Sequence, residues 1–425
     1  MEAAEHLPGP SGSEPESTAT RSSPASAQSD RTPPPRSGVP ILDLAREYEE
    51  VGELLAAATR EVFSRQNFIL GAQTVEFERV AALRCGVSHA VGCASGTDAL
   101  WLALTACRIG AGDAVVTTPF SFFASVSSIL RAGARPILAD IEPETFNLDP
   151  EAVRRGLNSA GKGGARAILA VDLYGQTADW DRLHAIRQEY SAGGPAGSSM
   201  VLIEDAAQAF GARWDGRPAG SLADVSAFSF YPTKNLGAAG DAGMVTTSSE
   251  EVAERLRMLR THGMRKRYYH DELGACSRMD TLQAAVLLAK LRFLDEWNRR
   301  RRVLASNYGS LLERAGIAER GPYPERGVVP PKVHPKAEHI FHQYVIRVRR
   351  RDELKEFLKS QEVSSEIYYP LPLHLQQALS GLGYGRGAFP ESERAAREVL
   401  ALPMFPQLTP AEQETVIAAV QRFLG

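Results

Sequence analysis

Short apolar runs alternate with helical stretches between residues 89 and 247, and this alternation constrains the fold more than any other feature. Alternation of this kind predicts an α/β layer with a mostly parallel sheet. The carboxyl ends of parallel strands lie at one edge of a sheet, so we expect a functional site there. The predicted strands are residues 89–93, 114–118, 136–140, 167–171, 200–204, 225–230 and 243–247, with helices at 98–108 and 123–132.

The composition and the hydrophobic pattern divide the whole chain into a tail, a large domain and a small domain. Residues 1–38 are rich in Ser and Pro and nearly lack large apolar side chains, which predicts a disordered tail. Residues 39–300 are assigned to a large α/β domain that starts with apolar residues at helical spacing and ends in a long amphipathic helix at 281–302. Residues 301–425 are assigned to a small C-terminal domain that includes a strand at 343–349.

Composition excludes several classes of function. The 425 residues carry 48 Lys and Arg against 51 Asp and Glu, and a net charge of −3 argues against a broad nucleic-acid surface. No long uncharged apolar run or signal peptide is evident, so we expect a cytoplasmic protein without a membrane span. The four cysteines form no Cys-x-x-Cys pair, and we predict neither a disulfide scaffold nor a metal site.

Two motifs at strand ends carry groups that suit ligand binding. Ser95-Gly96-Thr97 lies between a strand and a helix, where small residues let backbone N–H groups approach an anion at the helix N-terminus. An ordinary turn with a Ser or Thr helix cap has the same sequence. Glu204 and Asp205 follow a buried strand, at the end where sites form in open α/β sheets. A capping or salt-bridging acid is the structural alternative.

A lysine lies in the apolar, glycine-flanked segment Phe-Ser-Phe-Tyr-Pro-Thr-Lys-Asn-Leu-Gly at 228–237. Desolvation lowers the pKa of a lysine and frees its amine to act as a nucleophile. A surface lysine that extends its charge into solvent is the alternative for Lys234 taken alone. The Gly-rich segment 237–243 suits tight backbone paths near a ligand, but it is neither a P-loop nor a dinucleotide fingerprint.

The order of these motifs is more informative than any one of them. Pyridoxal 5'-phosphate (PLP) requires an anion cradle for its phosphate, an acid that pairs with its pyridinium nitrogen, and a lysine that forms a Schiff base. The stretch between Asp205 and Lys234 has room for one strand pair and a connection. The sequence therefore predicts a PLP enzyme with Lys234 and Asp205 as its catalytic residues.

With these motifs, the sequence resembles the DegT/DnrJ/EryC1/StrS family of PLP-dependent sugar aminotransferases from about residue 39 to the C-terminus. The matching segments are Phe-Ile-Leu-Gly at 68–71, Ser-Gly-Thr-Asp-Ala-Leu at 95–100, Leu-Tyr-Gly-Gln at 173–176, Glu-Asp-Ala-Ala-Gln-Ala at 204–209, Ser-Phe-Tyr-Pro-Thr-Lys-Asn-Leu-Gly at 229–237 and Ser-Arg-Met-Asp-Thr-Leu-Gln-Ala-Ala at 277–285. The resemblance implies PLP fold type I, which is aspartate aminotransferase-like, with a large α/β domain and a smaller C-terminal α+β domain. It also implies a homodimer with the active site at the subunit interface.

The resemblance assigns a role to each matching position. Lys234 corresponds to the Schiff-base lysine and proton shuttle, and Asp205 to the partner of the pyridine nitrogen. Phe122 corresponds to the aromatic residue that stacks on the cofactor ring, and Gln208 to a residue beside the opposite face or the phenolic oxygen. The phosphate contacts correspond to Gly96, Thr97 and Ser229.

Three positions depart from the family pattern. Cys276 stands where the family often has an Asn that reaches the neighbouring subunit's phosphate, and a thiol is a weaker hydrogen-bond donor than an amide. Asp172 and Tyr368 stand where the family usually has His. These two residues are interpreted either as a sign of altered substrate contacts or as substitutions without functional consequence.

The resemblance predicts transamination of a nucleotide-linked keto sugar to an amino sugar, with glutamate as amino donor and the keto group at C3. Arg265 and Arg267 flank a basic run that can clamp a diphosphate through two-pronged contacts, although a solvated basic loop explains the run equally well. Arg278 is a candidate for binding the donor carboxylate. The alternative function is a PLP-binding regulator or sensor without turnover. Dehydratases of the family replace the lysine with His, so Lys234 argues against that activity.

Overall fold

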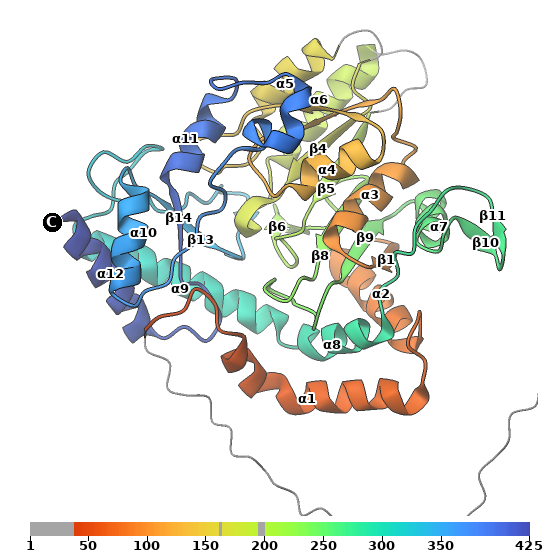
Figure 1. Ribbon diagram of the computed structural model, residues 1–425, viewed down its shortest axis with the longest axis horizontal. Coiled ribbons are helices and arrows are strands. Elements are labelled where there is room, and N and C mark those ends of the chain that lie inside the picture. Colours follow the sequence, from red (N-terminus) through yellow and green to blue (C-terminus); the bar gives the residue numbers. More distant parts are fainter. Residues whose placement is uncertain (1–37, 161–163, 194–199) are drawn as a thin grey trace, which may run out of the picture. The chain divides into compact units, whose positions relative to one another are not determined.

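A seven-stranded sheet forms the centre of the computed structural model, which describes residues 38–160, 164–193 and 200–425 (Figure 1). The strand order is β1-β9-β8-β5-β4-β2-β3. Strands β3, β2, β4, β5 and β8 run parallel to one another, whereas β9 is antiparallel to both β8 and β1, which confirms the predicted mostly parallel sheet. The strands are β1 His89–Cys93, β2 Ala114–Thr117, β3 Arg135–Leu138, β4 Ala167–Val171, β5 Val201–Asp205, β8 Val225–Ser229 and β9 Gly243–Thr247.

Helices cover both faces of this sheet, because successive side chains of a buried strand point to opposite sides. On β4, Ile168 packs into one apolar cluster and Leu169 into the other. The Leu169 face carries α3 Gly96–Ala106, α4 Ala124–Arg131 and α7 Glu250–Leu259. The Ile168 face carries α2 Ala72–Cys85, α5 Pro150–Ser159, α6 Trp180–Gly193 and α8 Thr281–Leu291.

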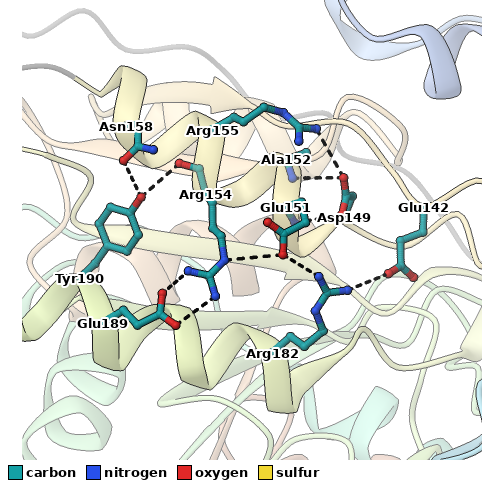
Figure 2. Close-up of polar contacts among 10 residues, drawn as sticks. All are labelled: Glu142, Asp149, Glu151, Ala152, Arg154, Arg155, Asn158, Arg182, Glu189 and Tyr190. Carbon is teal, nitrogen blue, oxygen red and sulfur yellow. Dashed lines mark hydrogen bonds and ion pairs between the residues drawn. The ribbon is translucent and has the colours of Figure 1, made fainter.

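On the outer surface, α5 and α6 are joined by a network of exposed ion pairs (Figure 2). Arg182 donates to Glu151 at 2.8 Å, and its other terminal nitrogen lies 3.6 Å from Glu142. Arg154 pairs with Glu189, while the Tyr190 hydroxyl donates to the main chain of Arg154 at 3.2 Å. The network fixes the two helices to each other on the side away from the sheet.

The predicted helix at 281–302 is wrong in one respect, because two helices occupy this stretch. Helix α8 ends at Leu291, and α9 Leu294–Arg314 begins after a break at Arg292 and Phe293. The two helices pack against different partners: α8 lies on α1 Leu44–Arg65 and α2, whereas α9 lies on α12 Pro410–Leu424. A break of two residues without Gly or Pro leaves the amphipathic pattern intact, so periodicity does not reveal it.

The C-terminal part of the chain builds its own apolar cluster around α9 and α12. A two-stranded antiparallel sheet of β13 Tyr344–Arg347 and β14 Val399–Leu402 confirms the strand predicted at 343–349. The predicted boundary between residues 300 and 301 falls inside α9, and the division into two domains stays a prediction. The remaining elements are β6 Arg213–Trp214, β7 Arg217–Pro218, β10 Met264–Lys266, β11 Tyr269–His270, β12 Ala337–Glu338, α10 Arg351–Ser360, α11 Pro390–Glu398 and three short 3-10 helices, η1 Leu173–Gly175, η2 Leu373–Leu375 and η3 Gln377–Leu382.

The predicted disordered tail lies outside the described residues, apart from Gly38. Among the helices of the described ranges, none combines the length and the apolar character needed to cross a membrane.

Candidate active site

Asp205 lies at the carboxyl end of β5, with its side chain on the sheet face covered by α3 and α4. Only 4% of the residue is exposed. One carboxylate oxygen accepts a hydrogen bond from the Ser125 hydroxyl at 2.7 Å, and the other accepts one from the Ala207 amide at 3.3 Å. Burial raises the pKa of Asp205, while these hydrogen bonds and the charge of Lys234 lower it. The site therefore holds a buried carboxylate with few protein partners.

Lys234 lies in the loop after β8, close enough to Asp205 for each charge to shift the pKa of the other group. A tight turn sets the loop, because the Lys234 amide donates to the Tyr231 carbonyl at 2.8 Å. Gly237 is required three residues after Lys234, since a Cβ there would overlap the Pro232 carbonyl. Burial lowers the pKa of Lys234 to about 8, although the negative charge of Asp205 opposes the shift. Near neutral pH a useful fraction of this amine is therefore unprotonated.

The predicted phosphate contacts come together where α3 begins beside the end of β8. A Cβ on Gly96 would lie 2.6 Å from the Ser229 Cβ, so the two backbones approach each other as closely as glycine allows. Ser95 caps α3 by accepting the Asp98 amide at 3.1 Å, and Thr97 follows Gly96 in the first turn. The first amides of a helix have no acceptor within the helix, which makes this end suitable for a phosphate.

Aromatic side chains from distant segments border the carboxylate. Phe122, in the loop before α4, is 58% exposed, and its ring centroid lies 6.4 Å from that of Tyr369. Gln208 joins this group: its amide nitrogen donates to the Tyr369 hydroxyl at 3.2 Å, and its carbonyl oxygen accepts the Tyr174 amide at 2.6 Å. The Tyr174 hydroxyl in turn donates to the Tyr368 carbonyl. The C-terminal segment thus closes one side of the site, with Tyr368 at its border.

Behind the lysine loop lies a buried polar network that sequence reasoning missed. The Asn235 amide nitrogen donates to Asn298 on α9 at 2.8 Å, and its carbonyl oxygen lies 3.1 Å from His342 Nδ1. Burial, reinforced by the positive charge of Lys234, holds the pKa of His342 well below its usual range, so the ring is neutral. His342 and Asn298 belong to no motif, and only the fold brings them to the residue after Lys234.

The predicted substrate-binding residues are not all joined to this centre. Arg265 and Arg267 lie in the exposed β10–β11 region, where Arg265 pairs with Asp271 at 3.1 Å. The Arg267 guanidinium lies 5.0 Å from the centre of its neighbouring Tyr268 ring. Within the described residues, no contact links these two arginines to Lys234 or Asp205.

Arg278 lies in the segment before α8, next to a serine that bonds the first turn of α3. It is half-buried, and its Nε has no hydrogen-bond partner among the described residues. The preceding Ser277 donates to Asp98 in the first turn of α3 at 2.8 Å. Cys276 is exposed on the same segment.

Asp172 is not in the site cavity, so the structure gives no support to altered substrate contacts at this position. The residue is fully buried. One of its carboxyl oxygens accepts the Ala178 amide at 2.8 Å and the Trp180 indole N–H at 3.2 Å, on the opposite face of the sheet from Asp205.

The residues present fit PLP. A cradle that a Cβ at Gly96 would fill lies at a helix N-terminus, and a buried carboxylate with spare acceptor capacity interacts with a lysine whose pKa is lowered. A mostly parallel sheet with these groups at its strand ends defines a fold type I PLP-dependent aminotransferase.

Comparison with known proteins agrees with this class of enzyme and identifies the family within it. The model of the DegT/DnrJ/EryC1/StrS aminotransferase family matches residues 49–421, and the chain belongs to this family. It is 44% identical to a "Pleiotropic regulatory protein" of Geobacillus stearothermophilus over 91% of this chain and 98% of that protein. It is 39% identical to the dTDP-3-amino-3,4,6-trideoxy-alpha-D-glucose transaminase of Streptomyces venezuelae, over 93% of this chain and 98% of the relative.

A solved structure gives the same result for the fold. The crystal structure of DesV from Streptomyces venezuelae, in complex with a ketimine intermediate, superposes with a TM-score of 0.84 at 39% identity. The match covers 91% of this chain and 98% of that one. The predicted family, fold class and cofactor are confirmed.

Proposed function

We propose that the protein transfers an amino group from glutamate to the C3 keto group of a nucleotide-linked sugar. The observation that carries the proposal is the interaction of Lys234 with Asp205 beside the Gly96–Ser229 cradle. The substrate class rests on relatives, one of which is a dTDP-3-amino sugar transaminase at 39% identity. The product of that relative carries its amino group at C3, as its name states, which supports the same keto position here.

When bound, PLP supplies an electron sink for the electrons released at the donor's α-carbon. Lys234 Nζ holds the cofactor and, once free, takes a proton from that carbon. A pKa of about 8 suits both tasks, because an unprotonated amine is the nucleophile and the base. The Asp205 carboxylate would pair with the ring nitrogen, and the hydrogen bond from Ser125 keeps that carboxylate in place. Phe122 would cover one face of the ring, and Gln208 would lie beside the opposite face or the phenolic oxygen.

The proposal extends to a homodimer in which a second copy completes the site. The β10–β11 hairpin projects from the side of the chain beyond α7 (Figure 1). Its Tyr268 is 76% exposed, and Leu273 beyond it is 95% exposed, which is unusual for large apolar residues. Arg265 and Arg267 of this hairpin would then clamp the sugar nucleotide's diphosphate in the neighbouring subunit, while Arg278 binds the donor carboxylate.

The half-reactions test this proposal directly. Glutamate added to the PLP-loaded protein should convert the absorbance of the bound cofactor to that of pyridoxamine phosphate. The pyridoxamine-loaded protein is then offered a panel of dTDP- and UDP-linked 3-keto and 4-keto sugars, and the 3-keto sugars should restore the first spectrum. Preference for the 4-keto sugars would overturn the keto position, and preference for another donor would overturn glutamate.

A PLP-binding regulator without turnover is the second candidate, and the 44% identity to a pleiotropic regulatory protein favours considering it. The same spectra separate the two functions. A regulator would bind PLP and leave its spectrum unchanged with every amino donor, whereas an aminotransferase would convert it.

A further inference from the structure

Two acids at the ends of neighbouring strands lie buried on the sheet face opposite the active site. Asp172 directly follows β4, and Glu204 is the penultimate residue of β5. Both are fully buried. Because side chains alternate along a strand, Glu204 points to the α6 face while its neighbour Asp205 points to the α3 and α4 face.

Glu204 is surrounded by hydrogen-bond donors, as an ionised carboxylate requires. Both of its oxygens lie 3.0 Å from the Gly220 amide, and Oε2 accepts the Ser226 hydroxyl at 2.6 Å. Loss of the negative charge would leave these donors with a poorer acceptor. The geometry therefore favours an ionised Glu204.

Asp172 has the opposite pattern. Its Oδ1 accepts two hydrogen bonds, from Ala178 and Trp180, but its buried Oδ2 has no donor among the described residues. The Asp172 side chain interacts with the Glu204 carboxylate, which can only accept a hydrogen bond while it is ionised. Two touching carboxylates cannot both be ionised in a buried site. A proton on Oδ2 turns the orphaned atom into a donor and satisfies both acids.

We infer that Asp172 is a neutral carboxylic acid that donates its Oδ2 proton to Glu204 and acts as a positioning residue for Asp205. The link to Asp205 is the main chain, since the Asp172 amide donates to the Asp205 carbonyl at 3.0 Å. The next turn carries Tyr174, whose amide bonds Gln208. The shared proton therefore holds the ends of β4 and β5 together directly behind the active-site carboxylate.

The electrostatics of the surroundings agree with this protonation state. Burial raises the pKa of Asp172 well above its usual range, and the negative charge of Glu204 raises it further. Cys85 on α2 faces Glu204, and burial raises the pKa of its thiol, so it is uncharged. The His184 ring on α6 lies 6.3 Å from that of Trp180 at a tilted angle, and burial lowers the pKa of the His184 ring.

The proton has a measurable effect on stability. The unfolded chain holds this carboxyl at an ordinary pKa of about 3.9, whereas the folded protein holds it higher. Folding therefore takes up a proton between the two pKa values, and the stability that the protonated acid provides at low pH is lost as pH rises toward the folded pKa. An Asp172→Asn variant supplies the same donor permanently and has no proton to take up.

The test compares the PLP-loaded wild type with D172N and with the exposed control Asp352→Asn by chemical unfolding. At pH values above the unfolded pKa and below the raised pKa of the folded state, the unfolding equilibrium constant of D172N should fall relative to that of wild type by up to about tenfold per pH unit. The pH profile of D352N should run parallel to that of wild type, because the Asp352 side chain is 81% exposed. Parallel pH profiles of D172N and wild type would show that Asp172 is ionised and would overturn the inference.

A second measurement tests the positioning role. Asp172→Ala removes the donor and leaves Glu204 exposed to a cavity, so kcat of the glutamate half-reaction should fall with little change in donor KM. D172N should restore kcat. If D172A does not fold, the pH profile of D172N still tests the protonation state. A D172N enzyme whose kcat is as low as that expected of D172A would overturn the positioning role. The uptake of a proton on folding does not depend on the sugar or the amino donor. The inference about Asp172 can therefore be wrong while the proposed function is right, and the reverse.

Discussion

Charged side chains meet in two contrasting settings in this molecule, on the outer surface of α5 and α6 (Figure 2) and at the carboxyl ends of β4 and β5. On the surface, Arg182 and Glu151 are 44% and 55% exposed, and several alternative partners surround each charge. At the strand ends, Asp205 and Lys234 interact under burial, and the pKa of each moves toward the neutral form. In the first setting water solvates and stabilises the charges, whereas in the second setting only protein groups can stabilise them.

The comparison also separates two neighbouring acids within the second setting. Glu204 has its acceptor sites filled by Gly220, Ser226 and Asp172. Asp205 has only the Ser125 hydroxyl and the Ala207 amide, which leaves acceptor capacity for a ligand. A buried acid with every lone pair used holds the fold together, whereas a buried acid with spare capacity is available for chemistry.

The largest expected effect is at Lys234. Lys234→Ala removes the group that holds the cofactor and moves the proton, so transamination and the absorbance of lysine-bound PLP should both disappear. Loss of the proton transfer alone is worth about 10²–10⁴-fold. The surface variant Lys336→Ala, at an ion pair with Asp181, should keep full activity. Measurable turnover by K234A would remove the lysine from the catalytic role.

The next largest effect is expected at Asp205. Asp205→Asn keeps the hydrogen bond from Ser125 but removes the charge that pairs with the ring nitrogen. Loss of one preorganised electrostatic contact lowers kcat by on the order of 10²–10³-fold. The half-reaction with glutamate measures it, with D352N as the control for an acid outside the site. Unchanged kcat in D205N would mean that the carboxylate does not face the cofactor.

A smaller effect should come from the serine behind this carboxylate. Ser125→Ala deletes a 2.7 Å hydrogen bond to Asp205, and a hydrogen bond to a charged group contributes about 1.5–3 kcal/mol. We expect kcat to fall by about tenfold or somewhat more, since 1.4 kcal/mol corresponds to tenfold. Ser128→Ala, one turn further along α4 and equally buried, is the matched control. Equal losses in both variants would indicate a packing effect.

Sequence reasoning found the parts of the site that lie in contiguous motifs. The strand order, the break between α8 and α9 and the partners of Asp205 depend on contacts between distant segments, which no local pattern encodes. Ser125 and Tyr369 reach the site from α4 and from the C-terminal part, and His342 reaches Asn235 across 107 residues. Asp172 shows the same limit, because the family resemblance left open whether it contacts the substrate, and only the fold shows that it is buried on the opposite face of the sheet from Asp205.

The smallest effect is expected on the surface side of the comparison. Arg182→Ala removes contacts with Glu151 and Glu142, but solvent-exposed pairs are typically worth about 0.2–1 kcal/mol. The free energy of unfolding should therefore fall by less than about 1 kcal/mol at low salt, and the difference from wild type should shrink as salt screens the charges. Catalytic rates should not change, because the ion-pair partners of Arg182, Glu151 and Glu142, do not belong to the candidate active site. A loss of several kcal/mol that persists at high salt would show that this network behaves like the buried acids, and the contrast between the two settings would no longer hold.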